Sequence, residues 1–360
     1  MAANQDKDVQ HNLTRQIHTL QTRHKSTLVR AIENVCSTEA ARMIFGQILD
    51  GVPTVPLVNG GHPPLTLPES HPARTEHQQL CDGVLDRLQQ FRNDFDVENL
   101  PLDSQAILAY QGAAIGSRLF ITRLIELVSR SIHQIAVEIS LLDESFHETD
   151  GLLSWTPPKT DDLFWLFSPD GPLPTWFNLE WYQDYKQYPK GSNDMIGYWA
   201  ENFIIGGILL FDRRVQVSPS SRRLAGEADP DSVYIHSERH QVTYRICKLL
   251  DSQKKEYLDF LLSDPADREV SCPLPLGAND DNLDRVDPEE PITQTGIYRD
   301  RWERAPLPDD GPDARLKDAI YHLDYPTVTD WAKSNSRAKV RRDGFVDSDE
   351  DMDDNYEANH

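Results

Sequence analysis

Two histidines lie four residues apart in the segment His236-Ser-Glu-Arg-His240, and imidazoles at this spacing can bind one metal ion when both sit on a helix. The apolar and β-branched residues at 233–236 instead predict that His236 ends a short strand, while His240 precedes a helical pattern. The two side chains are then not expected to share a face. The sequence therefore supports surface or helix-capping histidines better than a metal site at His236 and His240, and it predicts no metal and no cofactor.

The recurring motifs of enzyme active sites do not occur in this sequence. It contains no GxxxxGK[ST] phosphate-binding loop, no GxSxG nucleophile turn, no HExxH zinc motif and no GxGxxG after a predicted strand. Such motifs place backbone donors, nucleophiles or metal ligands at fixed spacings. We predict no catalytic residue and favour a protein that is not an enzyme, while an enzyme without these motifs stays open.

Five of the seven tryptophans lie between residues 155 and 199, in a segment that is also rich in tyrosine and proline. Large amphipathic rings are typical of binding surfaces as well as of cores. Glu180 and Asp184 would lie one helical turn apart if 176–185 were helical, as in a carbohydrate cleft. Core packing, a ligand groove and a hydrolase pair therefore remain as alternatives. The predicted binding surface consists of Trp165, Trp176, Trp181, Tyr185 and Trp199.

Four arginines form a local basic spot in this acidic chain. Arg213 and Arg214 follow a predicted strand, and Arg222 and Arg223 lie in the polar loop after it. Clustered guanidinium groups bind anionic groups well, so these four residues are an anion-binding candidate. The alternative is that they form ion pairs with Asp212 and neighbouring acids.

The C-terminal part is predicted to be a largely disordered acidic tail. From residue 264 to the end there are 25 Asp and Glu residues against 12 Lys and Arg residues, and proline is frequent. Ser348 is set among acidic residues and is a candidate phosphorylation site. The basic residues at 333–342 resemble a short nuclear-import patch.

The composition limits the functional classes. The chain has 360 residues, of which 38% are hydrophobic, with a net charge of −23 and a mean hydropathy of −0.57. This charge disfavours nucleic-acid binding, because phosphate backbones require clustered Lys and Arg. No apolar run reaches the ~18 residues of a membrane helix, no secretory signal is visible, and the four cysteines have no CxxC spacing. We expect a soluble protein of the cytoplasm or nucleus with free thiols and no membrane contact.

Hydrophobic periodicity predicts an α+β fold in which an N-terminal helical bundle packs with a small aromatic-rich region of a strand pair and a helix. The predicted domains are a helical region at 1–148, an aromatic-rich α/β region at 152–263 and an acidic, mostly disordered tail with short docking segments at 264–360. Predicted helices span 8–35, 40–49, 76–91, 103–142, 176–185 and 241–262, and predicted strands span 202–211 and 233–236. The apolar stripe at 118–142 also offers a surface for a homodimer.

The run YPKGSNDMIGYWAENFIIGGILLFDRRV, with DLFWLFSPDGPLPTWFNLEWYQDYKQYP before it and HQVTYRICKLLDSQKKEYLDFLL after it, resembles a group of intracellular proteins of filamentous ascomycete fungi. The resemblance covers residues 152–262 and extends more weakly to the N-terminal helices. That group has no established reaction, so the resemblance supplies no catalytic or ligand residue. It implies an intracellular fungal protein, with a link to specialised metabolism in some members.

These observations predict a non-catalytic interaction or regulatory protein that binds a protein partner through its aromatic-rich surface. The alternative is a small-molecule enzyme or a ligand-binding accessory protein of fungal secondary metabolism, with a small metabolite as its partner. A deep cavity with convergent polar groups would favour this alternative.

Overall fold

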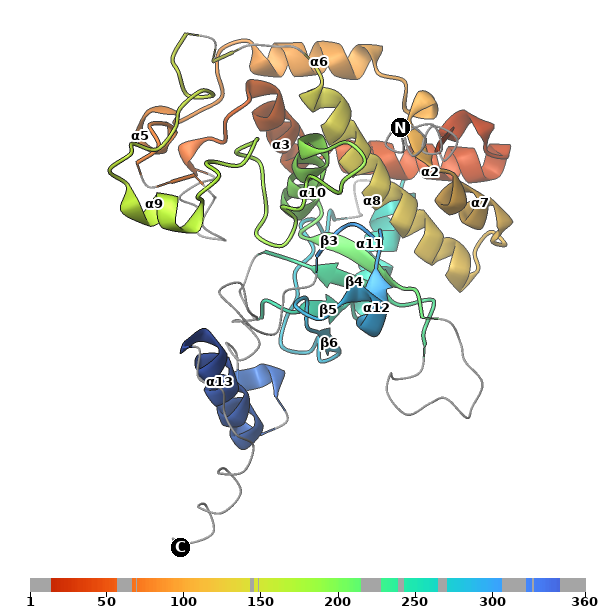
Figure 1. Ribbon diagram of the computed structural model, residues 1–360. Helices are drawn as coiled ribbons and strands as arrows, with labels where there is room; N and C mark the ends of the chain where they lie inside the picture. Colours follow the sequence, from red (N-terminus) through yellow and green to blue (C-terminus); the bar gives the residue numbers. More distant parts are fainter. Residues whose placement is uncertain are drawn as a thin grey trace, which may run out of the picture.

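The chain has a mixed α+β architecture, as its sequence predicts. The computed structural model describes residues 14–56, 67–68, 70–142, 146–147, 149–214, 228–238, 243–264, 271–305, 322–325 and 327–343. Figure 1 shows helices gathered around α8 and α10 in one half of the body, and a sheet in the other half, with α13 standing apart from both.

The N-terminal half of the chain contains one small two-stranded sheet and most of the helices. In chain order its elements are β1 (Thr14–Gln16), η1 (Ile17–Thr19), α2 (Thr22–Cys36), α3 (Glu39–Asp50), α5 (Ala73–Glu76), α6 (Val84–Asp94), η2 (Val97–Asn99), β2 (Pro101–Asp103), α7 (Ser104–Gly112) and α8 (Arg118–Ser140).

The predicted helix at 40–49 is confirmed as the body of α3. The Thr38 side chain accepts a hydrogen bond from the Ala41 N–H and caps the start of α3, and Gly51 ends the helix at a φ of 98°. The predicted helix at 8–35 is wrong at its start, because Arg15 pairs with Leu102 in the β1–β2 sheet and the helix begins at Thr22.

The two other predicted helices of this half are interrupted. The helix predicted at 76–91 begins only at Val84, because a turn separates it from α5. The helix predicted at 103–142 is divided into α7 and α8, and the new helix begins after Ser117, whose side chain accepts from the Phe120 N–H. Gly116 turns the chain between them at a φ of 80°.

α8 is the central helix of the body. It contacts α2, α3, α7 and α10, and Figure 1 shows it running diagonally through the helical half. Its side chains from Phe120 to Ile139 are mostly buried, so most of the apolar stripe at 118–142 packs within the fold. The homodimer surface at 118–142 stays a prediction.

The C-terminal half of the chain forms a five-stranded antiparallel sheet with order β6-β5-β4-β3-β7, together with the remaining helices. Its elements are α9 (Asp162–Phe167), α10 (Ser192–Ile204), β3 (Ile208–Asp212), β4 (Val233–His236), β5 (Ile246–Lys248), α11 (Asp251–Leu262), β6 (Arg285–Val286), α12 (Ile292–Thr295), β7 (Ile297–Tyr298), η4 (His322–Asp324) and α13 (Val328–Asp343). The predicted strand at 233–236 is confirmed as β4.

The predicted strand at 202–211 is half helix. α10 continues to Ile204 and β3 begins at Ile208, with Gly206 and Gly207 between them. α10 is buried from Asp194 onward, so it shows no polar face that would reveal its helical period. Gly206 has a φ of 110°, and a Cβ there would lie 2.0 Å from the carbonyl oxygen of Leu276. The glycine pair therefore permits both the turn and the close passage of another backbone segment.

Two more predicted helices are corrected. Within the segment 241–262, residues 246–248 form strand β5 and the helix begins at Asp251, because Ile246 and Cys247 are buried between β4 and β6. The segment 176–185 forms turns and extended backbone instead of a helix.

Residues 271–305 belong to the folded body, so the prediction of a mostly disordered tail is wrong for them. β6 and β7 form the two edges of the sheet. Glu303 is buried and accepts hydrogen bonds from the N–H groups of Arg299 and Asp300. Acidic residues in this segment are thus paired inside the fold, which composition alone does not reveal. The candidate Ser348 lies outside the described residues.

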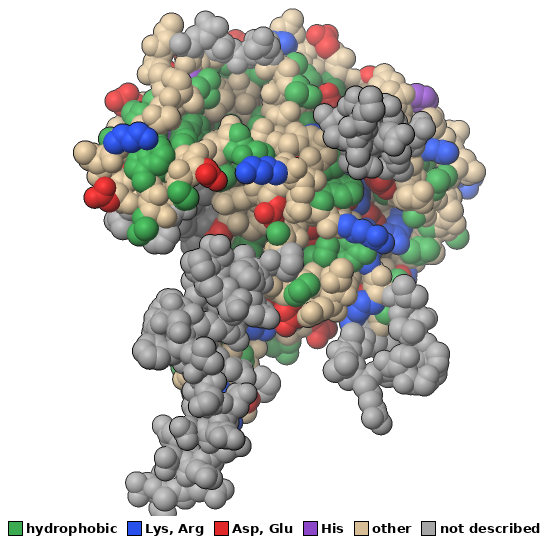
Figure 2. Space-filling model, viewed as in Figure 1, with side chains coloured by type: hydrophobic (Ala, Val, Ile, Leu, Met, Phe, Trp, Pro, Cys, Tyr) green, Lys and Arg blue, Asp and Glu red, His purple; other side chains and the backbone are tan. Residues whose placement is uncertain are grey.

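One hydrophobic cluster joins the helical half to the sheet, from Ile17 in the first half to Ile297 in β7. Within the described residues, no helix combines the length and apolar character needed to cross a bilayer. On the face drawn in Figure 2, Lys and Arg side chains are interspersed with Asp and Glu.

Candidate metal centre

Four potential metal ligands from separate segments converge beside the C-terminal end of α3. They are Asp50, His77, Cys81 and His147, and one ligand atom from each lies within 4.8 Å of the others. Asp50 is the last residue of α3, and the turn at Gly51 directs the chain away from it. His77 and Cys81 lie between α5 and α6, and His147 follows α8. The centre therefore joins three stretches of chain that are distant in sequence.

Backbone hydrogen bonds hold the ligands in place. The carbonyl oxygen of His77 accepts from the Val55 N–H at 2.7 Å, which ties the end of α5 to the segment after α3. The Cys81 N–H donates to Oδ2 of Asp50 at 3.2 Å. The Nδ1 atom of His147 lies 2.5 Å from Oδ2 of Asp150, a carboxylate outside the ligand set. Each of these three residues is thus positioned by a contact that does not use its own ligand atom.

The distances match those between ligands of one ion. Oδ2 of Asp50 lies 3.1 Å from Nε2 of His77, and Oδ1 lies 3.2 Å from Nε2 of His147. The Cys81 Sγ atom lies 3.7 Å from Nε2 of His147. A tetrahedral zinc ion with ligands at about 2.0–2.3 Å separates its ligand atoms by roughly 3.3–3.8 Å. The 3.7 Å distance lies within this range and the other two lie just below it, so binding one ion requires small shifts of these side chains.

A metal-free explanation must account for the same contacts as hydrogen bonds. It does so only in part, because Oδ1 of Asp50 and Nε2 of His77 are buried and neither makes a hydrogen bond of acceptable geometry. Both atoms are nevertheless close to a polar neighbour, at 3.2 and 3.1 Å. Atoms that approach without pointing at one another are expected when their lone pairs converge on a common point.

The Asp50 carboxylate and the neighbouring imidazoles stabilise each other's charged forms. Burial opposes ionisation of Asp50, but the imidazoles of His147 and His77 outweigh it and hold the pKa of this carboxyl well below its usual range. The same carboxylate raises the pKa of His147. Burial and the Asp50 charge raise the pKa of the Cys81 thiol to about 12, so metal binding must release the thiol proton.

The donor set identifies the class of ion. Two imidazoles, one thiolate and one carboxylate suit Zn²⁺, whereas Mg²⁺ and Ca²⁺ prefer oxygen ligands alone. Four protein ligands complete a tetrahedral shell, which is the arrangement of structural zinc sites; catalytic sites keep one position for water or substrate. Asp50, His77 and His147 are 1%, 5% and 3% exposed, which further limits access of a substrate to the ion.

The aromatic residues predicted as one binding surface are dispersed. Trp199 is fully buried against Phe177 and Phe203, and Trp176 is buried against His71, so the surface prediction is wrong for these two. Core packing, the alternative, describes them, because Trp199 packs on Phe177 and Phe203, and Trp176 packs on His71 and Trp155.

The remaining three aromatics are partly exposed and have separate surroundings. Trp165 lies on α9 with the Lys159 ammonium 4.1 Å from its ring centroid. Trp181 stacks on Tyr244 at 6.2 Å, and Tyr185 is half-buried against the core. The predicted carboxylate pair is not formed on a helix, and Asp184 instead accepts from the Ala305 N–H.

The arginine and histidine candidates are engaged inside the protein. Arg213 pairs with Glu126 at 2.5 Å, and Arg214 binds Asp212 through two hydrogen bonds. The structure therefore favours the ion-pairing alternative for both; Arg222 and Arg223 lie outside the described residues. His236 is buried in β4, with Nδ1 2.9 Å from the Tyr182 hydroxyl, and His240 also lies outside the described residues.

A second buried polar cluster links α8, α10 and the segment after β7. His133 contacts Oε1 of Glu201 through Nδ1 at 2.9 Å and Oδ1 of Asp194 through Nε2 at 3.0 Å. Arg299 donates to Oε2 of Glu201 at 2.6 Å. Both ring nitrogens face carboxylates, and this arrangement favours the doubly protonated, positively charged imidazole. This cluster balances its charges internally and fixes how α8, α10 and the C-terminal segment pack.

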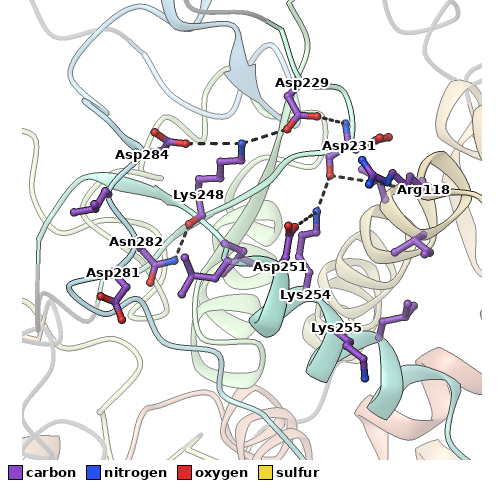
Figure 3. Close-up of a pocket in the computed structure, with 16 residues that line it drawn as sticks. Arg118, Asp229, Asp231, Lys248, Asp251, Lys254, Lys255, Asp281, Asn282 and Asp284 are labelled. Atoms are coloured by element: carbon purple, nitrogen blue, oxygen red, sulfur yellow. Dashed lines mark hydrogen bonds and ion pairs between the residues drawn. The ribbon is translucent and has the colours of Figure 1, made fainter.

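A pocket of about 610 Å³ lies between the start of α8, the end of β5 and α11. Figure 3 shows Lys248 between Asp229 and Asp284, at 3.2 and 3.8 Å, and Lys254 beside Asp251 at 3.3 Å. Apolar side chains, among them Leu258, complete the lining. Lys248 and Lys254 of this pocket are thus paired with aspartates.

The metal candidate was not identified from the sequence, although two local patterns carry it. His77 and Cys81 are four residues apart, and His147 and Asp150 are three apart. Neither pattern is a recognised zinc spacing. Asp50 and His147 are far apart in the sequence, so the sequence does not show that they lie close together in space. No protein-family model, curated protein or solved structure matches this chain.

Proposed function

We propose that the chain is a zinc-binding protein whose metal centre consists of Asp50, His77, Cys81 and His147. The observation that carries this proposal is the convergence of four ligand atoms within 4.8 Å, in a cluster where the buried Oδ1 of Asp50 and Nε2 of His77 make no hydrogen bond. The ion would join the end of α3 to the segment between α5 and α6 and to the segment after α8. Its role is structural, because the protein supplies all four ligands.

The test is direct measurement of zinc on the full-length chain. After removal of metal with a chelator, the chain is reconstituted with zinc, and bound metal is determined by elemental analysis and by competition with a chromogenic chelator. One zinc ion per chain is expected. His77→Ala and Cys81→Ala should lose this zinc, whereas His18→Ala and Cys272→Ser, at exposed positions outside the cluster, should keep it. Zinc binding that is equal in all four variants would refute the proposal.

Partner binding remains a second proposal, with a smaller surface than the sequence predicts. Trp165 and the neighbouring Leu166, which is 69% exposed, lie on α9 within the segment that follows His147. The function we favour is non-catalytic: the zinc ion stabilises the fold, and the segment with α9 binds a protein partner. We also place the protein in the cytoplasm or nucleus, because its four cysteines are free thiols and such compartments keep thiols reduced.

Small-molecule binding is supported by a different observation, the pocket beside α11. Its volume of about 610 Å³ lies within the range of ligand sites. Because Lys248 and Lys254 face Asp229 and Asp251, a zwitterionic ligand could replace these internal pairs with contacts of both signs. Ligand-observed NMR with free amino acids tests this idea, and Leu258→Trp, which fills the pocket, should abolish any signal. Signals that survive this substitution would place binding elsewhere.

A further inference from the structure

The four ligands of the metal centre differ in their access to solvent. Asp50, His77 and His147 are buried, whereas Cys81 is partly exposed. Among the four ligand residues, Cys81 is therefore the one that a reagent in solution can reach. Cys81, which carries the most reactive donor atom of the set, is thus also the most exposed of the four ligand residues.

Zinc changes the chemistry of this sulfur. A cysteine bound to zinc is held as its thiolate, and thiolates are the form that hydroperoxides oxidise. The other cysteines provide an internal comparison: Cys247 is buried, whereas Cys36, which is as partly exposed as Cys81, and the exposed Cys272 both lie outside the cluster. Selective oxidation at Cys81 would therefore follow from metal binding and exposure together.

We infer that the metal centre is a peroxide-sensitive switch in which oxidation of Cys81 releases the zinc ion. This inference rests on the proposed zinc site and names its regulation. The Cys81 thiolate attacks one oxygen of a hydroperoxide; an S–O bond forms, the O–O bond breaks, and the leaving oxygen departs as hydroxide or alkoxide. The sulfur loses two electrons and becomes a sulfenic acid, while the peroxide gains them. The ion then keeps only three ligands of the original set.

The surrounding contacts allow release without loss of the fold. The Cys81 N–H donates to Asp50 whether or not the sulfur binds an ion, so the turn before α6 stays attached to α3. His147 keeps its contact with Asp150, and the His77 carbonyl keeps its bond from Val55. A sulfenic acid is reduced back by thiols, so the switch is reversible until further oxidation occurs.

The experiment uses the zinc-loaded full chain and hydrogen peroxide, with a chromogenic zinc indicator and mass spectrometry of the cysteines. We expect loss of one zinc ion per chain in step with oxidation of Cys81, and recovery of binding after treatment with a thiol. Cys81→His retains a zinc ligand that peroxide does not convert in this way, so this variant should keep its zinc. Cys272→Ser should release zinc as the unaltered chain does.

The outcomes separate this inference from the proposed zinc site. If the unaltered chain binds no zinc at the start, the proposed function is wrong. If zinc is bound but stays in place while Cys81 is oxidised, or leaves while Cys81 is unmodified, only the switch is wrong. If Cys81→His fails to load zinc, the ratio of released zinc to oxidised Cys81 in the unaltered chain still decides the matter.

Discussion

The Nδ1 atom of His147 lies 2.5 Å from Oδ2 of Asp150, on the side of the imidazole opposite the candidate metal site. A proton held on Nδ1 by Asp150 leaves Nε2 as the nitrogen that would bind a metal ion once the ring is neutral. Asp150 is therefore a positioning residue, since it orients a ligand without belonging to the ligand set. Its other oxygen accepts from the Leu152 N–H at 2.9 Å, which fixes the carboxylate in turn.

The first prediction concerns this residue. Asp150→Asn should weaken zinc binding by about 10–100-fold, because a neutral amide holds the His147 ring less firmly and makes Nε2 a poorer donor. Competition with a chromogenic chelator measures the change. Asp82→Asn is the matched control, since it removes one negative charge from the exposed position next to Cys81. Equal losses in both variants would mean that only the local charge matters.

The second prediction concerns Gly197, which lies on α10 against the His133 ring. A Cβ at this position would come within 2.5 Å of the imidazole, so Gly197→Ala must displace His133 from Asp194 and Glu201. Breaking such a buried charged cluster should cost on the order of 3 kcal/mol of unfolding free energy. Gly112→Ala, at a helical position with open space, should instead be neutral or stabilise by up to about 1 kcal/mol. Urea unfolding compares the two; a small loss for Gly197→Ala would show that the ring moves freely.

The sequence predicted elements best where one local signal decided their ends. The helix predicted at 40–49 agrees closely with α3, because the Thr38 side-chain cap and Gly51 in the left-handed region fix its ends within a few residues. The signals failed where tertiary burial removed the polar face of an element, as in α10, or supplied partners for charged residues, as for Arg299 and Glu303. Both failures arise because the deciding contacts come from distant parts of the chain.

The metal candidate shows the same limit more sharply. His77 and Cys81 share a short segment, but Asp50 and His147 reach them only through the packing of α3, α5 and α8. The weak candidate pair His236 and His240 has the recognisable spacing, but His236 lies in strand β4 and not on a helix. Spacing is informative when one helix carries both ligands and loses its meaning when the ligands come from separate segments.

The third prediction concerns pH. Burial alone would lower the pKa of His133, but its hydrogen bonds to Asp194 and Glu201 outweigh burial and raise it. Arg299 donates to the same Glu201 carboxylate, and its positive charge opposes protonation of the His133 ring. Because the folded pKa lies above the unfolded value of about 6.5, this stabilisation is full below that pH and is lost as pH rises through the folded pKa.

The measurement is the difference in unfolding free energy between the unaltered chain and His133→Gln, taken from about pH 6 to about pH 9. The difference should shrink as the pH rises, because only the charged imidazole is better than glutamine as a donor to two carboxylates. A difference that stays constant across this range would show that His133 is neutral in the folded protein.

The fourth prediction separates backbone strain from steric exclusion at two glycines. Gly206 and Gly116 both have a positive φ, at 110° and 80°, but only Gly206 faces another backbone, that of Leu276. Gly116→Ala should cost about 1–2 kcal/mol for the left-handed conformation alone. Gly206→Ala also brings the new Cβ against the backbone of Leu276, and no side-chain movement relieves that clash. Its loss of unfolding free energy should therefore be several times larger, or the chain should fail to fold. Equal costs would mean that the Leu276 segment is not held against β3 in solution.

The fifth prediction tests the division of the aromatic segment into core and surface. In chains that retain a single tryptophan, Trp199 should resist quenching by iodide, because it is enclosed by Phe177 and Phe203. Trp165 on α9 should be quenched, although Lys159 covers part of one ring face. If Trp165 is as protected as Trp199, then α9 is covered in solution and the partner surface proposed there does not exist. If both are quenched, the packing of α10 against the preceding segment is looser than the contacts of Trp199 imply.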